Sequence, residues 1–363
     1  MDDRYSRHDL IPGWKQESLR TATVVIAGLG AVGNEVARSL AMAGVGKLIL
    51  CDFDTVSPSN LSRCILFRQK DIGRFKTAVA AERLAEINPE LILDARQGYF
   101  AQVLGLGELQ KASLLIACVD NLNARLDITG RCNLVHLPYL DIGTHPWGGE
   151  VRLYFDPEAA CYACSLPPER LQSDSRASCR APAEEVAVGA AIHTTALAAA
   201  WGTSFALRYL LGLSCPEGIF RFNAITGTTD LVSVARESGC PLHMPVGNVL
   251  ELDITHAHTI HELLSELHPD SRVWLWNAVC EHEFCSACSY KKAVWNTEKI
   301  VDICPQCGNT VQHTYTQYLE ELPGNLRLLD IGIPDREILG VQTPEGFTWI
   351  ALSPQVDTTE RLR

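Results

Sequence analysis

The chain of 363 residues has a formal charge of -12, and 47% of its residues are hydrophobic against 20% charged. This composition is typical of a folded protein with room for two domains, and not of a disordered chain. The negative charge argues against binding to nucleic acid or to an anionic membrane surface, because both need a concentrated positive field.

The N-terminal residues Met1 to Arg4 contain acids and no apolar run, so we expect no secretion signal and a cytoplasmic protein. In that reducing compartment the fourteen cysteines are expected to be metal ligands, a nucleophile or buried apolar groups. The apolar segment 186–213 includes His193 and Arg208, which predicts a buried core helix instead of a membrane span.

The most informative stretch begins at Val24, where a β-branched run leads into Gly28, Gly30 and Gly33 and then into a helical pattern. It predicts a strand, a tight turn and a helix N-terminus, whose free N–H groups and dipole attract phosphate. Asp52 ends a second apolar run, where an acid can bind a ribose hydroxyl. This pattern fits NAD as well as ATP, and the glycines could also serve only strand–helix packing.

A polar loop follows the second strand and contains Asp54, Asn60 and Arg63. Lys76 then opens a helical pattern, and a lysine at a helix start opposes the helix dipole. Lys76 is therefore more natural as a phosphate ligand than as a solvated surface residue.

A third apolar run, 113–119, predicts a core strand that places Asp120 at the edge where ligands bind in open α/β sheets. From its position alone, Asp120 fits a helix N-cap as well as a metal-binding or catalytic role.

Together these residues resemble the adenylation domain of the E1-like activating enzymes, the superfamily of ThiF, MoeB, HesA and ubiquitin E1. The resemblance covers residues 1 to about 245 and rests on the joint order and spacing of Arg7, Gly28, Gly30, Gly33, Asp52, Asp54, Asn60, Arg63, Lys76 and Asp120. It implies a Rossmann-like α/β adenylation domain over residues 1–250. It also implies an enzyme that uses ATP and Mg²⁺ to adenylate the C-terminal glycine of a ubiquitin-like or sulfur-carrier protein.

The resemblance further implies that Asp52 holds the ribose, that Arg63 and Lys76 hold the triphosphate, and that Asp120 holds magnesium. Arg7 would reach the nucleotide of the other subunit of a homodimer. Such fixed cations stabilise the charge that gathers on the α-phosphate and the leaving pyrophosphate. The chain departs from the family at Cys64, where Gln is usual, and at Ala31, which replaces a common glycine. Neither departure removes a charged group.

Two groups of cysteines have the spacing of zinc ligands. The first is Cys161, Cys164, Cys240 and His243, and its alternative is two unrelated pairs of buried residues. The second is the ribbon-like set Cys285, Cys288, Cys304 and Cys307, in which Cys280 or His282 could replace a ligand. Between Cys280 and Cys307 three lysines stand against four acids, which argues against a nucleic-acid surface.

Cys179 lies in a polar stretch that predicts an exposed loop, where Arg176 and Arg180 could lower its pKa. Its position resembles that of the family's nucleophilic cysteine, which takes the acyl group as a thioester or enters an acyl-persulfide route. The alternative is an idle loop cysteine. Three cysteines in or near apolar runs are expected to be packing residues: Cys51, Cys118 and Cys132.

Residues 251–363 are expected to form an α+β extension with the zinc ribbon at about 280–310, and we interpret it as a partner-docking module. The patterns predict a helix over 259–267, a strand over 272–279, and two strands between 326 and 353 broken by Gly340 and by the turn at Pro344. An E2-like protein is a further candidate partner.

Two other functions stay open. An NAD-dependent oxidoreductase would share the glycine loop and Asp52, but it gives no reason for Arg63, Lys76 and Asp120. A zinc scaffold with an inactive adenylation fold would account for the long C-terminal region.

Overall fold

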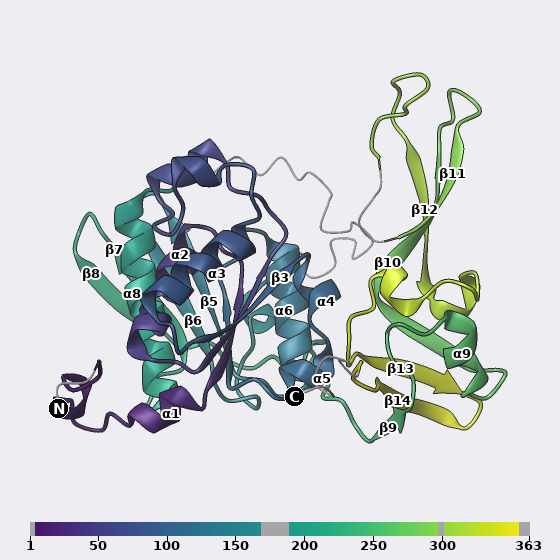
Figure 1. Ribbon diagram of the computed structural model, residues 1–363. Helices are drawn as coiled ribbons and strands as arrows, with labels where there is room; N and C mark the ends of the chain where they lie inside the picture. Colours follow the sequence, from purple (N-terminus) through teal and green to yellow (C-terminus); the bar gives the residue numbers. More distant parts are fainter. Residues whose placement is uncertain (1–3, 168–188, 297–300, 356–363) are drawn as a thin grey trace. The chain divides into compact units, whose positions relative to one another are not determined.

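The computed structural model describes residues 4–167, 189–296 and 301–355, which divide into two compact units (Figure 1). Unit 1 contains the described residues of 4–100, 109–167 and 189–245. Unit 2 contains those of 101–108, 246–296 and 301–355. Each unit has its own sheet and its own hydrophobic core.

Unit 1 is built on an eight-stranded sheet in the order β3-β2-β1-β4-β5-β6-β7-β8. The first five strands in this order pair in parallel, and the last three extend the sheet in antiparallel pairing. The strands are β1 (Thr23–Ala27), β2 (Lys47–Asp52), β3 (Ile92–Gln97), β4 (Leu114–Ala117), β5 (Tyr139–His145), β6 (Gly148–Tyr154), β7 (Gly218–Asn223) and β8 (Thr228–Val232). The parallel part confirms the predicted α/β class.

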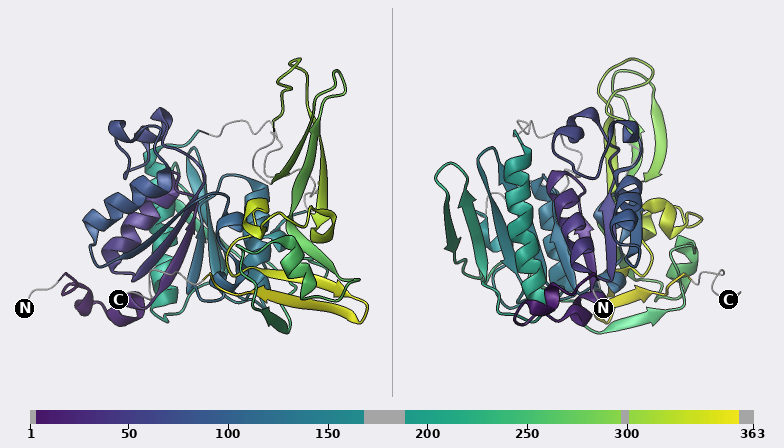
Figure 2. Two further views of the ribbon diagram at one scale, coloured as in Figure 1. Left: turned by 45° about the vertical axis from the view of Figure 1, so that its right-hand side comes forward. Right: turned by 60° about the vertical axis from the view of Figure 1, so that its left-hand side comes forward.

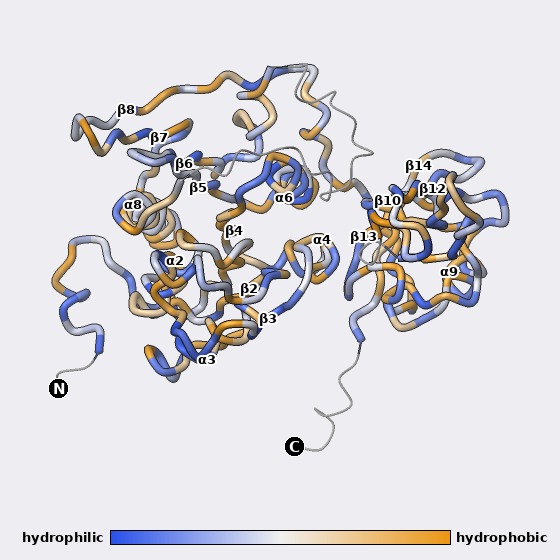
Figure 3. The backbone as a smooth tube through the Cα atoms, turned by 90° about the horizontal axis from the view of Figure 1, so that it is seen from above, coloured by the Kyte–Doolittle hydropathy of each residue, from blue (hydrophilic) through white to orange (hydrophobic). Residues whose placement is uncertain are grey.

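The α-helices that begin in unit 1 are α1 (Gln16–Arg20), α2 (Ala31–Ala43), α3 (Lys76–Ile87), α4 (Phe100–Val103), α6 (Leu122–Leu134) and α8 (Ile192–Leu210). Its short 3₁₀ helices are η1 (His8–Leu10), η2 (Pro58–Ser62), η3 (Gln69–Asp71) and η4 (Ala163–Ser165). Helices α2, α3 and α8 share one core with the sheet, while α6 packs on β4 from the other side (Figure 3). The sheet of unit 1 is therefore covered on both faces in its parallel part.

The predicted elements of unit 1 are found with small shifts at their ends. The segments predicted around Val24 and over 113–119 form β1 and β4, whose residues are almost all buried, as expected for central parallel strands. The apolar segment 186–213 contains α8, which packs against α2, β5 and β6. In the part of the chain that the structure describes, no helix is both long enough and apolar enough to cross a membrane.

Unit 2 contains a six-stranded sheet in the order β11-β10-β13-β14-β9, with β12 also paired to β10. Only the β14–β9 pair is parallel among the described strands of this unit. The elements are α5 (Leu106–Leu109), β9 (Val249–Leu252), α9 (Ile260–Ser265), β10 (Arg272–Phe284), β11 (Lys291–Asn296), β12 (Gln312–Tyr318), η5 (Leu319–Glu321), η6 (Leu328–Ile331), β13 (Ile338–Thr343) and β14 (Gly346–Leu352).

Two expectations for unit 2 were wrong. Gly340 does not break a strand but lies inside β13, paired with Trp274 and Trp349. A Cβ there would lie 2.7 Å from Cζ of the Phe347 ring, so the glycine leaves room for an aromatic ring over the sheet. The strand predicted to end at Val279 continues to Phe284, because β11 and β12 pair with this second half of β10.

Candidate functional site

The three glycines of the first turn have different roles. Gly28 has a φ of 92°, and a Cβ on it would lie 2.6 Å from the Cys118 carbonyl oxygen. A Cβ on Gly33 would lie 2.0 Å from the Gly28 carbonyl oxygen. Gly30 has no atom within 4 Å of its Cβ position. Packing therefore accounts for Gly28 and Gly33, whereas Gly30 leaves an open approach to the backbone, as a phosphate-binding turn requires.

The N-terminus of α2 adds attraction for an anion at this turn. Gly30 is the N-cap residue, no side chain caps the helix, and no acid lies in its first turn. The first N–H groups of a helix lack intrahelical partners, and with the helix dipole they favour negative charge. The turn can therefore hold a phosphate group.

Asp52 clamps this turn to the end of β2. Its Oδ2 accepts a hydrogen bond from the Leu29 backbone N at 2.6 Å, and its Oδ1 accepts one from the Asp54 backbone N at 2.8 Å. Burial raises the pKa of the Asp52 carboxyl, while the positive charge of Lys76 acts to lower it. The structure thus gives Asp52 a backbone-holding role that the sequence did not predict.

Lys76 is buried at the first position of α3, beside the same carboxylates. Its Nζ lies 2.6 Å from Asp54 Oδ2 and 3.9 Å from Asp52 Oδ2. These two acids offset the unfavourable position of an ammonium at a helix N-terminus. The structure therefore brings together three of the predicted site residues, Asp52, Asp54 and Lys76.

Asn60 and Arg63 lie on and just after η2, in the loop between β2 and α3. Asn60 is buried, and its Oδ1 accepts a hydrogen bond from the Ser57 backbone N at 2.9 Å. Arg63 is half-buried, and its Nη1 donates to the Ser59 carbonyl oxygen at 2.7 Å. Asn60 thus shapes the short helix that presents the Arg63 guanidinium.

Asn34 on α2 was missed at the sequence level and is fully buried. Its Nδ2 donates to the carbonyl oxygens of Leu29 at 2.7 Å and Gly30 at 3.1 Å. Its Oδ1 accepts from the Leu66 backbone N at 3.0 Å. Asn34 therefore ties the glycine turn to the loop that follows Arg63. The signal available in the sequence was an Asn inside an apolar helix, where it is disfavoured unless it has partners.

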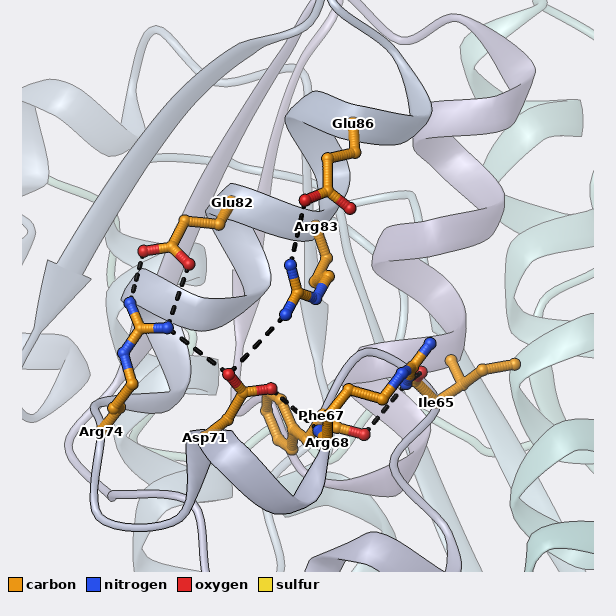
Figure 4. A network of polar contacts seen from close by, with 8 residues as sticks. All are labelled: Ile65, Phe67, Arg68, Asp71, Arg74, Glu82, Arg83 and Glu86. Carbon is orange, nitrogen blue, oxygen red and sulfur yellow. Dashed lines mark hydrogen bonds and ion pairs between the residues drawn. The ribbon is translucent and has the colours of Figure 1, made fainter.

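A second missed feature fixes the loop between Arg63 and Lys76 to α3 (Figure 4). Asp71 is fully buried and accepts a hydrogen bond from the Arg68 backbone N at 2.8 Å. Its Oδ1 also lies 3.4 Å from Arg74 Nη1 and 3.7 Å from Arg83 Nη2. The loop carrying Arg63 is therefore anchored at its far end by the buried Asp71 carboxylate and the two arginines that face it.

Asp120 follows β4, which pairs in parallel with β1. The C-terminal ends of these neighbouring strands lie at one edge, so Asp120 and the glycine turn share that edge. The N-cap of α6 is Asn121, whose Oδ1 accepts from the Ala124 backbone N at 2.8 Å. The N-cap of α6 is thus its neighbour and not Asp120, and the exposed Asp120 carboxylate is available to a ligand.

A cleft of about 550 Å³ opens at the C-terminal end of β5 and over β6 and β7. Arg125, which lines it, forms an ion pair with the buried Asp141 and donates through Nη2 to the Val119 carbonyl oxygen at 2.9 Å. Burial raises the pKa of Asp141 to about 6, although Arg125 acts to lower it. Val119 directly precedes Asp120. The Arg125 side chain therefore connects the cleft with the predicted metal-binding carboxylate.

The first predicted metal cluster is assembled in unit 1. The ligand atoms of Cys161, Cys164, Cys240 and His243 all lie within 4.8 Å of one another. Sγ of Cys161 is 3.8 Å from Sγ of Cys164, and Sγ of Cys164 is 3.2 Å from Nε2 of His243. The two pairs therefore lie together in the fold, and their ligand atoms suit a tetrahedral zinc ion.

The second cluster is assembled in unit 2 from Cys285, Cys288, Cys304 and Cys307. Cys280 does not belong to it, because this buried residue directs its Sγ to the His282 carbonyl oxygen at 3.7 Å. The His282 ring packs on Trp295 instead, with the two centroids 5.2 Å apart.

The remaining predicted residues are placed as follows. Arg7 is exposed in the N-terminal segment before η1. Cys179 lies outside the described residues. Cys51 and Cys132 are buried and Cys118 is half-buried, in line with the predicted packing roles, and burial raises the pKa of Cys118 and Cys132.

A model of the ThiF family matches residues 4–242. The chain belongs to the ThiF family. Over 244 residues it is 32% identical to the sulfur carrier protein ThiS adenylyltransferase of Escherichia coli (strain K12), covering 66% of this chain and 94% of that relative. The predicted membership of the E1-like superfamily is confirmed.

Two other relatives of this ThiF-family chain are informative. Ubiquitin-like modifier-activating enzyme 5 of Arabidopsis thaliana is 31% identical over 169 residues, which cover 42% of this chain and only 39% of that enzyme. The crystal structure of E. coli MccB with ATP has a TM-score of 0.56 at 22% identity, covering 67% of this chain and 74% of MccB. This structural likeness shows the fold alone.

The contacts of Asn34 lead to a first prediction. Replacing Asn34 by Ala should lower the free energy of unfolding by about 1–3 kcal/mol, because the buried Leu66 backbone N loses its acceptor. It should also weaken nucleotide binding, because the glycine turn loses its tie to the Arg63 loop. Urea unfolding and ATP titration would measure both effects. Met42→Ala, an exposed change on the same helix, should alter neither.

Proposed function

We propose that this ThiF-family chain is an ATP-dependent adenylyltransferase that activates the C-terminal glycine of a ubiquitin-like or sulfur-carrier protein. The observation that carries the proposal is one sheet edge where an uncapped helix N-terminus, a buried lysine and an exposed aspartate occur together. The adenylyltransferase and activating-enzyme names of its relatives support it.

In this proposal the triphosphate lies against Gly30 and the N-terminus of α2. Lys76 and Arg63 neutralise its oxygens, and Asp52 accepts a hydrogen bond from the ribose through a lone pair left free by its backbone contacts. Asp120 would hold a magnesium ion, which would supply further neutralisation of the phosphates. These side chains act by position and charge, so the site needs no general base.

The reacting carboxylate would enter through the cleft lined by Arg125. A glycine-ending segment lying over β5 and β6 would bring its terminus toward Asp120, since Val119 joins the two places. The carboxylate oxygen attacks the α-phosphorus, a new O–P bond forms, and the bond to pyrophosphate breaks. No proton moves in this step, because the attacking group is already an anion.

Asp120→Asn should reduce ATP–pyrophosphate exchange roughly a hundredfold or more, because the substitution removes the negative charge proposed to bind the magnesium ion at the phosphates. The fold should persist, since the residue is exposed and does not cap α6. Asn121→Ala is the matched control. It should cost about 1 kcal/mol of stability through the lost cap yet keep exchange.

Exchange at the wild-type rate in Asp120→Asn would refute the magnesium-binding role. Failure of the unmodified chain to support exchange with any small glycine-ending protein of the same genome would favour the inactive zinc scaffold.

The proposal includes a homodimer in which Arg7 reaches the nucleotide of the partner subunit. Its support is an apolar surface on α8, where Leu197 and Trp201 are exposed, near the exposed Trp147 whose ring packs on His193. Such exposed aromatic residues are common in subunit contacts.

Arg7→Ala and Lys76→Ala should each be inactive alone, and mixing them should restore part of the exchange activity. A mixed dimer would contain one site that has both side chains, if Arg7 acts across the interface. Purified heterodimers carrying two affinity tags would test this. No recovery in such heterodimers would mean that Arg7 acts within its own chain or has no catalytic role.

Transfer of the activated acyl group to Cys179, as a thioester or along an acyl-persulfide route, is the second step of the proposal. Zinc at the first cluster would support this step, because Cys164 and Cys240 are the two ends of the sequence segment that contains Cys179. We assign residues 1–250 to the adenylation domain, residues 251–363 to a partner-docking extension that could receive an E2-like protein, and the whole chain to the cytoplasm.

Cys179→Ala should keep pyrophosphate exchange, which needs only the nucleotide and the carboxylate, and lose the covalent adduct with the carrier protein. Intact mass measured without reductant would detect the adduct. Cys280→Ala is the control, because Cys280 is fully buried in β10 and should be unable to receive the acyl group. An adduct that survives in Cys179→Ala but disappears in Cys280→Ala would show that the nucleophile is Cys280 in unit 2 and not Cys179.

A further inference from the structure

The second cysteine cluster lies outside residues 4–242, the part of the chain that the ThiF family model matches. It is at the end of an arm made by the second half of β10 with β11 and β12, seen as the long green ribbons in Figures 1 and 2. We call the described residues of 279–316 the ribbon arm. None of the residues proposed for the adenylation reaction lies on it.

The ribbon arm forms the same turn twice. The Cys285 backbone N donates to the Tyr290 carbonyl oxygen at 3.0 Å, and the Cys304 backbone N donates to the Asn309 carbonyl oxygen at 2.7 Å. Each of these bonds joins the first cysteine of a CxxC pair to the residue five positions later. The two turns, 285–290 and 304–309, therefore present their sulfur atoms in equivalent ways.

The four sulfur atoms of these turns gather at one point. Sγ of Cys285 lies 3.5 Å from Sγ of Cys307, and Sγ of Cys288 lies 3.6 Å from Sγ of Cys304. A tetrahedral site with zinc–sulfur bonds of about 2.3 Å has sulfur atoms about 3.8 Å apart. The spacing in the ribbon arm is close to this value, and all four atoms lie within 4.8 Å of one another.

The end of the ribbon arm has too small a core to be stable without a further bond. Its buried cluster consists of Cys285, Cys304 and Val311, with Cys288 and Tyr290 packed against it. One aliphatic side chain among sulfur atoms cannot offset the entropy of ordering two turns. A metal ion bound by four thiolates supplies that free energy in small domains of this kind.

Glu283 joins the two turns beside the sulfur atoms. It is fully buried, and its carboxylate accepts hydrogen bonds from the Tyr290 hydroxyl at 2.9 Å and from the Val301 backbone N at 2.8 Å. Tyr290 ends the first turn and Val301 precedes the second. A buried carboxylate is costly unless hydrogen-bond donors satisfy it. The buried position of Glu283 therefore depends on the two turns lying together as they do here.

We infer that Cys285, Cys288, Cys304 and Cys307 bind one zinc ion in a closed structural site. Glu283 is the positioning residue that holds the two ligand-bearing turns together. The ribbon arm folds only with the metal. The site has four protein ligands and no open position, so it is structural and not catalytic. It does not depend on the adenylation proposal.

Zinc counting on the purified full-length protein tests the inference. The unmodified chain should contain two zinc ions, and Cys285→Ser and Cys161→Ser should each lose one, from separate clusters. Cys280→Ser is the matched control, because this cysteine lies on the same strand outside the cluster, and it should keep both ions. Pyrophosphate exchange in Cys285→Ser should persist, which separates this result from a failure of the adenylation proposal.

Three outcomes of the count would overturn the inference: both ions retained in Cys285→Ser, iron in place of zinc, or a single zinc that Cys161→Ser removes. A tetrathiolate site can also take iron, so the element must be identified.

Trypsin cleavage of the unmodified chain, with and without zinc, tests the inference even if Cys285→Ser fails to fold. Chelation should expose Lys291 and Lys292, which lie on the arm, to rapid cleavage by trypsin, and added zinc should restore protection. Cleavage at the same rate with and without zinc would contradict metal-dependent folding.

Glu283→Gln tests the positioning role. It should keep two zinc ions but release one to a chelator roughly tenfold faster or more, because support around the ligands is weakened. Glu281→Gln, on the same strand, should release zinc at the rate of the unmodified chain. Equal rates for Glu283→Gln and the unmodified chain would remove Glu283 from the proposal.

Discussion

The candidate site depends on the two hydrogen bonds that the Asp52 carboxylate accepts from the backbone of Leu29 and Asp54. They join the glycine turn after β1 to the chain that leaves β2. The same carboxylate faces the Lys76 ammonium, so one buried anion holds the turn and stabilises the cation placed beside it. Loss of this anion would leave two backbone donors unsatisfied and a buried lysine with fewer partners, and the site would lose both shape and charge balance.

The change from parallel to antiparallel pairing within one sheet explains how two kinds of ligand could meet. The parallel strands β1, β2 and β4 end at one edge and supply the turn, Asp52 and Asp120. Beyond β5 the sheet continues as the antiparallel strands β6 to β8, and the cleft lies over this part. Arg125 joins the two regions through Asp141 and the Val119 carbonyl. In the proposed reaction, a nucleotide and an extended peptide segment approach this point from different sides.

The sequence was sufficient for features that depend on local pattern. Strands β1 and β4 are continuous apolar runs, and the acids that follow such runs must lie at the sheet edge. It was insufficient for side chains whose partners are distant: Asn34 contacts Leu66, and Asp71 contacts Arg83, at separations that no periodicity encodes. Gly340 was misread for a related reason. Its meaning depends on the Phe347 ring across the strand pair, whereas glycine alone usually indicates a break.

The two cysteine clusters differ in what their closure would constrain. Cys161 and Cys240 are 79 residues apart, and the sequence between them contains Cys179 and α8. Cys285 and Cys307 are 22 residues apart and close only the tip of the ribbon arm. The entropy of closing a chain rises with the logarithm of its length, so a bond at the first cluster restricts many more conformations. Closure of the first cluster therefore constrains a long segment of unit 1, whereas the effect of the second stays within the arm whose turns it joins.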